Sequence, residues 1–167
     1  MFKAICGLLV LDEGEIQIDG VKKRNTEILK QAGVIIEEPA FLSRYSGYKN
    51  LEYLYMIHHK KDKQYLEEVL LQVGLEPKSR KHVAKYSMGM RQRLALAQAI
   101  MENPEILILD EPFNGLDNRG VEEMRALFLK LKEEGKTILV ASHNAEDIRV
   151  LCDHVYQMDG GVLSVVR

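Results

Sequence analysis

The chain has 167 residues, of which 46% are hydrophobic, so it contains enough apolar material for one domain with a sizeable core. Its 23 basic and 25 acidic residues give a net charge of -2, which provides no support for a polyanion-binding protein, and no nucleic acid partner is expected. Cys6 and Cys152 have no metal-ligand spacing and no apolar run approaches the roughly 20 residues of a membrane span, which together indicate a cytoplasmic protein.

The first half of the chain begins with a predicted helix. Residues 1–9 place apolar side chains at helical spacing, which predicts an amphipathic helix that starts at or before Met1 and has no capping side chain. Alternation in 15–19 and the apolar run 34–36 then predict two short strands. From residue 50 to 75 an apolar stripe predicts a small helical lobe, interrupted by Gly74 and Pro77.

The second half alternates between helix and strand. The patterns predict a helix over 88–102, a buried strand at 106–109, a helix that stops at Gly135, a strand at 137–141 and a helix from Asn144. Residues 155–166 indicate two further strands around an Asp-Gly-Gly turn. Such alternation implies an α/β fold with parallel strands and crossover helices.

Two carboxylates follow the predicted strand at 106–109. Asp110 and Glu111 lie where open α/β sheets bind ligands, at a carboxyl end. One acid there can hold Mg²⁺ and the next can polarise a water, the two tasks of phosphoryl transfer to water. Taken alone, these residues also fit an ordinary strand end followed by an Asp-Glu-Pro turn.

A second candidate binding feature opens the helix over 88–102. Ser87 and Gly89 stand at its start, where free N–H groups and the helix dipole favour a phosphate. The alternative is simply a helix capped by a serine.

Read as one block, YSMGMRQRLALAQAIMENPEILILDEPFNGLD (residues 86–117) resembles the signature motif, helix, Walker B motif and D-loop of the ABC ATPases, in order and spacing. Ser142-His143 resembles the switch histidine of that family, and VIIEEPAF (34–41) resembles its Q-loop. The resemblance implies a P-loop NTPase (RecA-like) parallel sheet core, here 1–37 and 88–167, with an inserted α-helical subdomain at about 38–87. It also implies that the N-terminal strands and phosphate-binding loop of the family are missing.

The resemblance assigns roles to individual residues. Asp110 would ligate Mg²⁺ through water, Glu111 would act as general base, and His143 would contact the γ-phosphate of ATP. Because the family pairs head to tail, Ser87 and Gly89 would face ATP held by the opposite protomer. The nucleotide-binding set that it implies is Ser87, Met88, Gly89, Met90, Glu37 and Asp117, with Glu37 also a ligand for Mg²⁺.

Two motifs depart from the family pattern. The signature, usually Leu-Ser-Gly-Gly-Gln, is Tyr-Ser-Met-Gly-Met at residues 86–90, and its backbone N–H groups can still bind phosphate. Glu37 replaces the usual Q-loop glutamine; it cannot donate a hydrogen bond when ionised but can bind Mg²⁺ or water. This glutamate, with EPAF and NGLD, resembles the bacitracin and lantibiotic exporter subgroup.

No G-x-x-x-x-G-K-[ST] phosphate loop occurs in the 167 residues. Without the hydrogen-bond donors of this loop, the binding free energy of ATP is expected to weaken by on the order of 6 to 12 kcal/mol. A micromolar affinity corresponds to a binding free energy of only about 8 kcal/mol. The chain alone is therefore expected to bind ATP weakly or not at all and to show no measurable hydrolysis. The strand TILVA (137–141), which neighbours the missing strand in the family, is expected to form an exposed apolar edge.

The first functional hypothesis is the ATPase subunit of an ABC exporter, a homodimer or heterodimer held at the inner face of the cell membrane by a transmembrane permease subunit. The second is a non-catalytic interaction module that docks on an intact ATPase or on a membrane subunit. A soluble ABC protein of translation or chromosome maintenance would need paired cassettes or long coiled coils, which are not apparent. Pro39, Phe41, Tyr45 and Tyr48 would either contact the permease or pack beneath the helical lobe.

Overall fold

A parallel sheet of β3 (Ala32–Ile35), β4 (Ile106–Asp110) and β5 (Thr137–Ala141), in the order β3-β4-β5, organises the computed structural model, which describes residues 1–24, 27–37 and 39–167. Ile35 lies beside Leu109, and Asp110 beside Ala141. Because the strands are parallel, the segments that follow them meet at one edge of the sheet. Glu37, Glu111 and His143 all belong to these segments.

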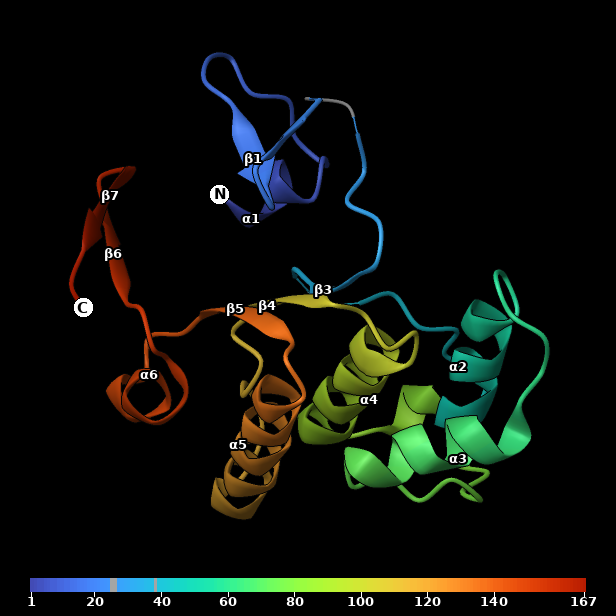
Figure 1. Ribbon diagram of the computed structural model, residues 1–167. Helices are drawn as coiled ribbons and strands as arrows, with labels where there is room; N and C mark the ends of the chain where they lie inside the picture. Colours follow the sequence, from blue (N-terminus) through green and yellow to red (C-terminus); the bar gives the residue numbers. More distant parts are fainter. Residues whose placement is uncertain (25–26, 38) are drawn as a thin grey trace.

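One face of the sheet is covered by α4 (Met88–Ile100) and α5 (Asn118–Glu133). Leu107, Leu109 and the half-buried Ile138 and Val140 pack there in one hydrophobic cluster with the helices. Helix α4 comes close to β3 because residue 33 is glycine: a Cβ on Gly33 would lie 1.9 Å from the carbonyl oxygen of Ala99. Figure 1 shows both helices on one side of the strands and the N-terminal segment on the other.

The predicted helical stretch at 50–75 is two helices, α2 (Gly47–Tyr55) and α3 (Lys63–Gln72), followed by a short 3₁₀ helix, η1 (Val83–Lys85). The predicted small helical lobe is confirmed, and two N-caps that were not singled out from the sequence open its helices. The Ser46 hydroxyl accepts a hydrogen bond from the Lys49 amide, and the Asp62 carboxylate accepts one from the Tyr65 amide. The lobe packs on α4 through fully buried leucines of the same hydrophobic cluster: Leu51, Leu66, Leu70 and Leu94.

A buried glutamate of α2, Glu52, joins this helix to Lys61 in the segment that follows it. The side chain of Glu52 is 3% exposed, and its carboxylate accepts hydrogen bonds from Tyr48 (3.2 Å), Lys61 (2.8 Å) and Lys49. Burial raises the pKa of Glu52, but the hydrogen bonds from Lys49, Lys61 and Tyr48 outweigh it and lower that pKa from 4.5 to about 2. The ionised carboxylate therefore stabilises the fold.

The stability of the chain should fall in acid because of this group. A carboxylate with a depressed folded pKa contributes stability above its unfolded pKa, near 4.5, and loses it as the pH falls towards 2. The shift corresponds to roughly 2 to 3 kcal/mol, reduced by screening of the exposed lysines. Urea unfolding at pH 7 and pH 3 should show this loss in the native chain and a smaller loss in Glu52→Gln. Glu68→Gln, at an exposed glutamate of α3, should retain the native pH dependence.

The N-terminal segment contains α1 (Phe2–Ile5) and an antiparallel hairpin of β1 (Ile16–Ile18) and β2 (Val21–Lys23). The predicted helix over 1–9 is too long: Cys6 ends the helix and Gly7, at φ +78°, turns the chain. As predicted, α1 has no side-chain cap. The second strand was missed, although Asp19-Gly20 is a hairpin signal and both residues have positive φ.

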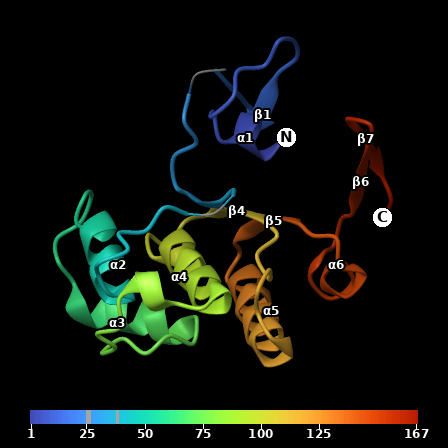
Figure 2. The same ribbon diagram turned by 180° about the vertical axis from the view of Figure 1, so that it is seen from behind.

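The chain ends with α6 (Ala145–Leu151) and a hairpin of β6 (Tyr156–Asp159) and β7 (Val162–Val165). The predicted turn is confirmed, with Gly160 and Gly161 both at positive φ. Seen from behind in Figure 2, this hairpin and the helical lobe lie at opposite ends of the molecule.

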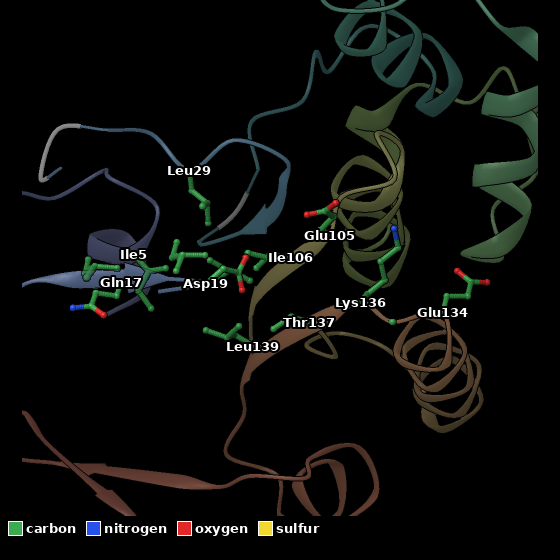
Figure 3. Close-up of a pocket in the computed structure, with 14 residues that line it drawn as sticks. Ile5, Gln17, Asp19, Leu29, Glu105, Ile106, Glu134, Lys136, Thr137 and Leu139 are labelled. Atoms are coloured by element: carbon green, nitrogen blue, oxygen red, sulfur yellow. The ribbon is translucent and has the colours of Figure 1, made fainter. Parts of the chain in front are cut away.

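A cleft of about 610 Å³ separates the second face of the sheet from the N-terminal segment (Figure 3). Ile106, Ile108 and Leu139 line it from the sheet, and Ile5 and Leu29 line it from the N-terminal segment. The prediction of an edge strand is confirmed, because β5 is the last strand of the described sheet, with half-buried side chains from Ile138 to Ala141. This face of the sheet is therefore only partly covered.

Candidate active site

Glu111 and His143 form a direct pair at the carboxyl edge of the sheet. The His143 ring Nδ1 lies 2.8 Å from Glu111 Oε1, and the His143 backbone N–H donates to the same oxygen at 3.1 Å. An ionised carboxylate only accepts, so Nδ1 carries the proton in this arrangement. The hydrogen bond to Glu111, together with its negative charge, raises the pKa of His143. The two residues come from segments after β4 and β5, as the topology predicts.

The backbone of Glu111 is held in an unusual conformation, with φ +46°. A left-handed conformation costs a non-glycine residue about 1 kcal/mol or more and persists only where the surroundings hold it. The Glu111 amide donates to the Ala141 carbonyl at 2.9 Å. From α4, the Gln92 amide group donates to the carbonyls of Glu111 (3.4 Å) and Pro112 (2.9 Å). Strain at a carboxylate on an open edge is typical of a functional residue.

Gln92 was not singled out from the sequence. Its position in α4, one turn after Ser87, is an ordinary surface position of a helix, and only the fold shows that it reaches the chain after β4.

The start of α4 lies against the segment that follows Glu111. The Ser87 hydroxyl accepts from the Met90 amide at 3.2 Å, so the serine caps the helix. A Cβ on Gly89 would lie 2.8 Å from the Gly115 carbonyl oxygen, and one on Gly115 would lie 2.5 Å from Met88 Cγ. The two glycines thus allow close contact between the 87–90 turn and the 113–117 segment. Ser87 and Met88 remain exposed.

Asp117 begins the next helix. Its carboxylate accepts from the Gly120 amide at 2.9 Å and caps α5. Asp117 was expected in the D-loop, and its capping role was not predicted from the sequence. The proposed contact of Asp117 with nucleotide stays a prediction.

Asp110 and Glu37 are the predicted ligands of Mg²⁺. Asp110 ends β4, half-buried, at the carboxyl edge. Glu37 follows β3 on the same edge, at φ +65°, but its carboxylate pairs with Lys3 at 2.5 Å and is exposed. That pair lowers the pKa of Glu37. Glu38, in the same sequence motif, lies outside the described residues.

The carboxylates at this edge fit a Mg²⁺ ion that is also bound by phosphates and waters. Within residues 1–24, 27–37 and 39–167, no group of three His, Cys, Asp or Glu side chains is arranged to hold a metal. Mg²⁺ is commonly bound by one or two carboxylates together with phosphates and waters. Asp110 is therefore suited to an ion that arrives with a nucleotide, rather than to a preformed site made of protein ligands.

A buried ion pair beneath the 142–144 loop was also missed. Asp147 of α6 is 2% exposed and pairs with Arg125 of α5, while the Ser142 hydroxyl donates to Asp147 at 3.3 Å. The sequence signal was weak, since Asp147 is one of several charged residues on a short helix.

The comparison with protein families agrees with this geometry. The family model described as ABC transporter matches residues 1–114, which is most of the chain. The chain belongs to the ABC transporter ATP-binding family. The predicted family and its P-loop NTPase-type fold are thereby confirmed, and members of the family are ATPases.

Named relatives of this ABC chain come from several bacteria. It is 39% identical to the uncharacterized ABC transporter ATP-binding protein YybJ of Bacillus subtilis (strain 168), over 98% of the chain and 75% of YybJ. It is 42% identical to the bacitracin transport ATP-binding protein BcrA of Bacillus licheniformis, over 92% of the chain and 51% of BcrA. The ABC chain thus spans three quarters of one relative and about half of the other.

A solved structure shows the same fold. The ATP-binding cassette MJ0796, a dimer bound to ADP and Pi, matches 99% of the ABC chain with a TM-score of 0.82 at 22% identity, and the match covers 78% of MJ0796. None of the helices that the structure describes combines the length and hydrophobicity needed to cross a bilayer.

Proposed function

We propose that this chain provides the catalytic edge of an ABC exporter ATPase, which binds and hydrolyses ATP as a head-to-tail dimer. The observation that carries the proposal is the Glu111–His143 pair, which lies at the carboxyl edge of a parallel sheet next to the start of α4. Family membership supports ATP as the nucleotide. The similarity to BcrA, whose name records bacitracin transport, supports export.

Each residue has a defined task in this proposal. Glu111 takes a proton from the attacking water through its carboxylate, and His143 contacts the γ-phosphate. Mg²⁺, held through Asp110, would neutralise phosphate charge when bound. The N–H groups of Ser87, Met88, Gly89 and Met90 would bind phosphate oxygens of the ATP on the partner protomer. Glu37 and Asp117 would complete the nucleotide surroundings.

His143 occupies one oxygen of the carboxylate that would serve as base. Its ring Nδ1 and its backbone N–H both donate to Glu111 Oε1. In the proposed chemistry the attacking water would therefore donate to the other oxygen, Oε2, while the contacts at Oε1 orient the carboxylate.

The proposed membrane partner would contact exposed apolar residues of α2 and of the segments that flank it. Leu42, Tyr45, Tyr53, Met56 and Ile57 are exposed there, and the rings of Tyr45 and Tyr53 pack edge to face at 5.3 Å. Exposed aromatics favour protein interfaces. This surface would hold the chain at the inner face of the membrane through a permease subunit.

Two of the aromatic residues that were candidates for that interface pack against the interior of the protein instead. Phe41 and Tyr48 are only partly exposed and pack against the hydrophobic cluster, so they fit the packing alternative. Tyr45, which is exposed, remains in the proposed interface.

A second candidate function is an interaction module without catalysis of its own. The exposed turn at Ser87 supports it, because a composite site formed there would use the phosphate loop of the partner. Such a module would still present Ser87 and Gly89 to ATP on a loop-bearing partner. Both proposals share the head-to-tail pairing.

That pairing can be tested by sedimentation with BcrA in which the glutamate aligned with Glu111 is replaced by glutamine. We expect ATP-dependent association, weakened at least about tenfold by Ser87→Glu, because a carboxylate at the start of α4 repels phosphate. Ser46→Glu is the matched control, since Ser46 caps α2 in the same way, and it should associate normally. No ATP-dependent association, or equal loss in both variants, would contradict the proposal.

A further inference from the structure

The buried pair beneath the 142–144 loop has a specific geometry. The Nε and Nη2 atoms of Arg125 donate to a single oxygen, Asp147 Oδ1, at 2.9 and 2.5 Å. Asp147 is 2% exposed and Arg125 is 8% exposed, so both charges are withdrawn from water. A buried carboxylate needs donors for both of its oxygens. The arrangement leaves Oδ2 for a donor other than arginine.

Ser142 supplies that donor. Its hydroxyl donates to Asp147 Oδ2 at 3.3 Å and accepts from the backbone N–H of Asn144 at 3.1 Å. One hydroxyl thus joins the buried carboxylate to the residues on both sides of His143. The 142–144 loop is thereby fixed to α6 and, through Arg125, to α5.

The position of this loop determines how His143 meets Glu111. Both the ring Nδ1 and the backbone N–H of His143 donate to Glu111 Oε1. A side-chain rotamer alone can bring the ring to the carboxylate. The backbone N–H reaches it only if the loop itself is correctly oriented, so the paired contact depends on the tether at Ser142.

We propose that Asp147, held by Arg125, is a positioning residue that acts through the Ser142 hydroxyl to set His143 against Glu111. The inference rests on the proposed function, in which His143 and Glu111 act together at the nucleotide. Arg125, Asp147 and Ser142 touch neither water nor nucleotide in this scheme. They determine the orientation of the 142–144 loop, which carries His143 to the nucleotide.

The decisive variants change the hydroxyl and leave every charge in place. Glu111 and, more weakly, Asp147 are the charged groups that raise the pKa of His143, so Asp147→Asn would lower that pKa by loss of charge alone. Ser142→Ala removes only the tether, and Ser142→Thr restores a hydroxyl. Ser164→Ala is the control, because Ser164 is an exposed serine of β7 whose hydroxyl donates to Gln157.

NMR of the full 167-residue chain tests the inference, with His143 assigned by its loss in His143→Gln. We expect Ser142→Ala to shift the titration midpoint of His143 downward and to move its backbone amide resonance. Ser142→Thr should restore both, and Ser164→Ala should change neither. An unchanged His143 titration and amide in Ser142→Ala, or no rescue by threonine, would overturn the inference.

The experiment is independent of the proposed function. It requires no ATP, no partner and no hydrolysis, so a failure of ATP-dependent association would leave its result interpretable. Conversely, an unchanged His143 in Ser142→Ala would leave the ATPase proposal standing. A Glu111→Gln sample provides the positive control, since it removes the hydrogen-bond acceptor that raises the pKa of His143.

Discussion

Replacing Glu111 with glutamine is expected to lower ATP hydrolysis about 100- to 10,000-fold, the usual contribution of a general base. The amide keeps the size of the carboxylate but cannot take a proton from water. Because no G-x-x-x-x-G-K-[ST] sequence occurs in the 167 residues, the measurement uses the chain fused behind an N-terminal segment that supplies such a loop, assayed by phosphate release. ATP binding by the fusion should persist in the variant.

Glu105→Gln is the matched control for this experiment. Glu105 is an exposed glutamate just before the amino end of β4. It carries the same carboxylate as Glu111 but lies at the opposite edge of the sheet from the proposed site. Its turnover should equal that of the unmodified fusion. Undiminished hydrolysis in Glu111→Gln would remove this residue from the role of base, whereas a fusion that does not hydrolyse ATP at all would count against the catalytic proposal.

The second large effect is expected on stability. Asp147→Ala should lower the free energy of unfolding by about 3 to 5 kcal/mol, because it leaves the Arg125 guanidinium buried without its main partner. Among the residues that the structure describes, Arg125 would then keep an ion pair only with the exposed Glu122, at 2.7 Å. Urea unfolding followed by circular dichroism at pH 7 measures the loss.

Asp153→Ala tests whether the loss of stability in Asp147→Ala comes from the burial of the ion pair or from ion pairing as such. Asp153 forms an ion pair with Lys132 at 2.7 Å, but its side chain is 66% exposed. Exposed pairs contribute at most about 1 kcal/mol, so this variant should unfold nearly as the native chain does. Similar losses in the two variants would show that burial of Asp147 does not determine its effect.

The sequence predicted the elements of the site better than their mutual contacts. Asp110 and Glu111 were placed at a strand end by the apolar run before them, and His143 was singled out by its resemblance to the switch histidine of the family. Parallel pairing of the strands then brings Glu111 and His143 together. Gln92 and Asp147 escaped prediction because their partners lie 20 and 22 residues away. Such contacts depend on how helices pack on the sheet, which local patterns do not specify.

The fold was predictable where a pattern was clear. Strand β4 follows an unbroken apolar run and helix α5 follows a long helical periodicity, and both were placed within a few residues. The short elements were less accurate: α1 ended early at Gly7, and β2 was missed because its residues are mostly polar and exposed. The lobe was predicted without the bounds of its helices, which the caps at Ser46 and Asp62 determine.

Helix α4 runs from the exposed turn at Ser87 to the buried contact between Ala99 and Gly33, a distance of about 20 Å for its 13 residues. Near the exposed end, Gln92 is tied to the backbone at Glu111 and Pro112. A shift of α4 relative to β4 would therefore alter the backbone at Glu111. One glutamine thus links the position of a helix to the conformation of the residue that carries the carboxylate.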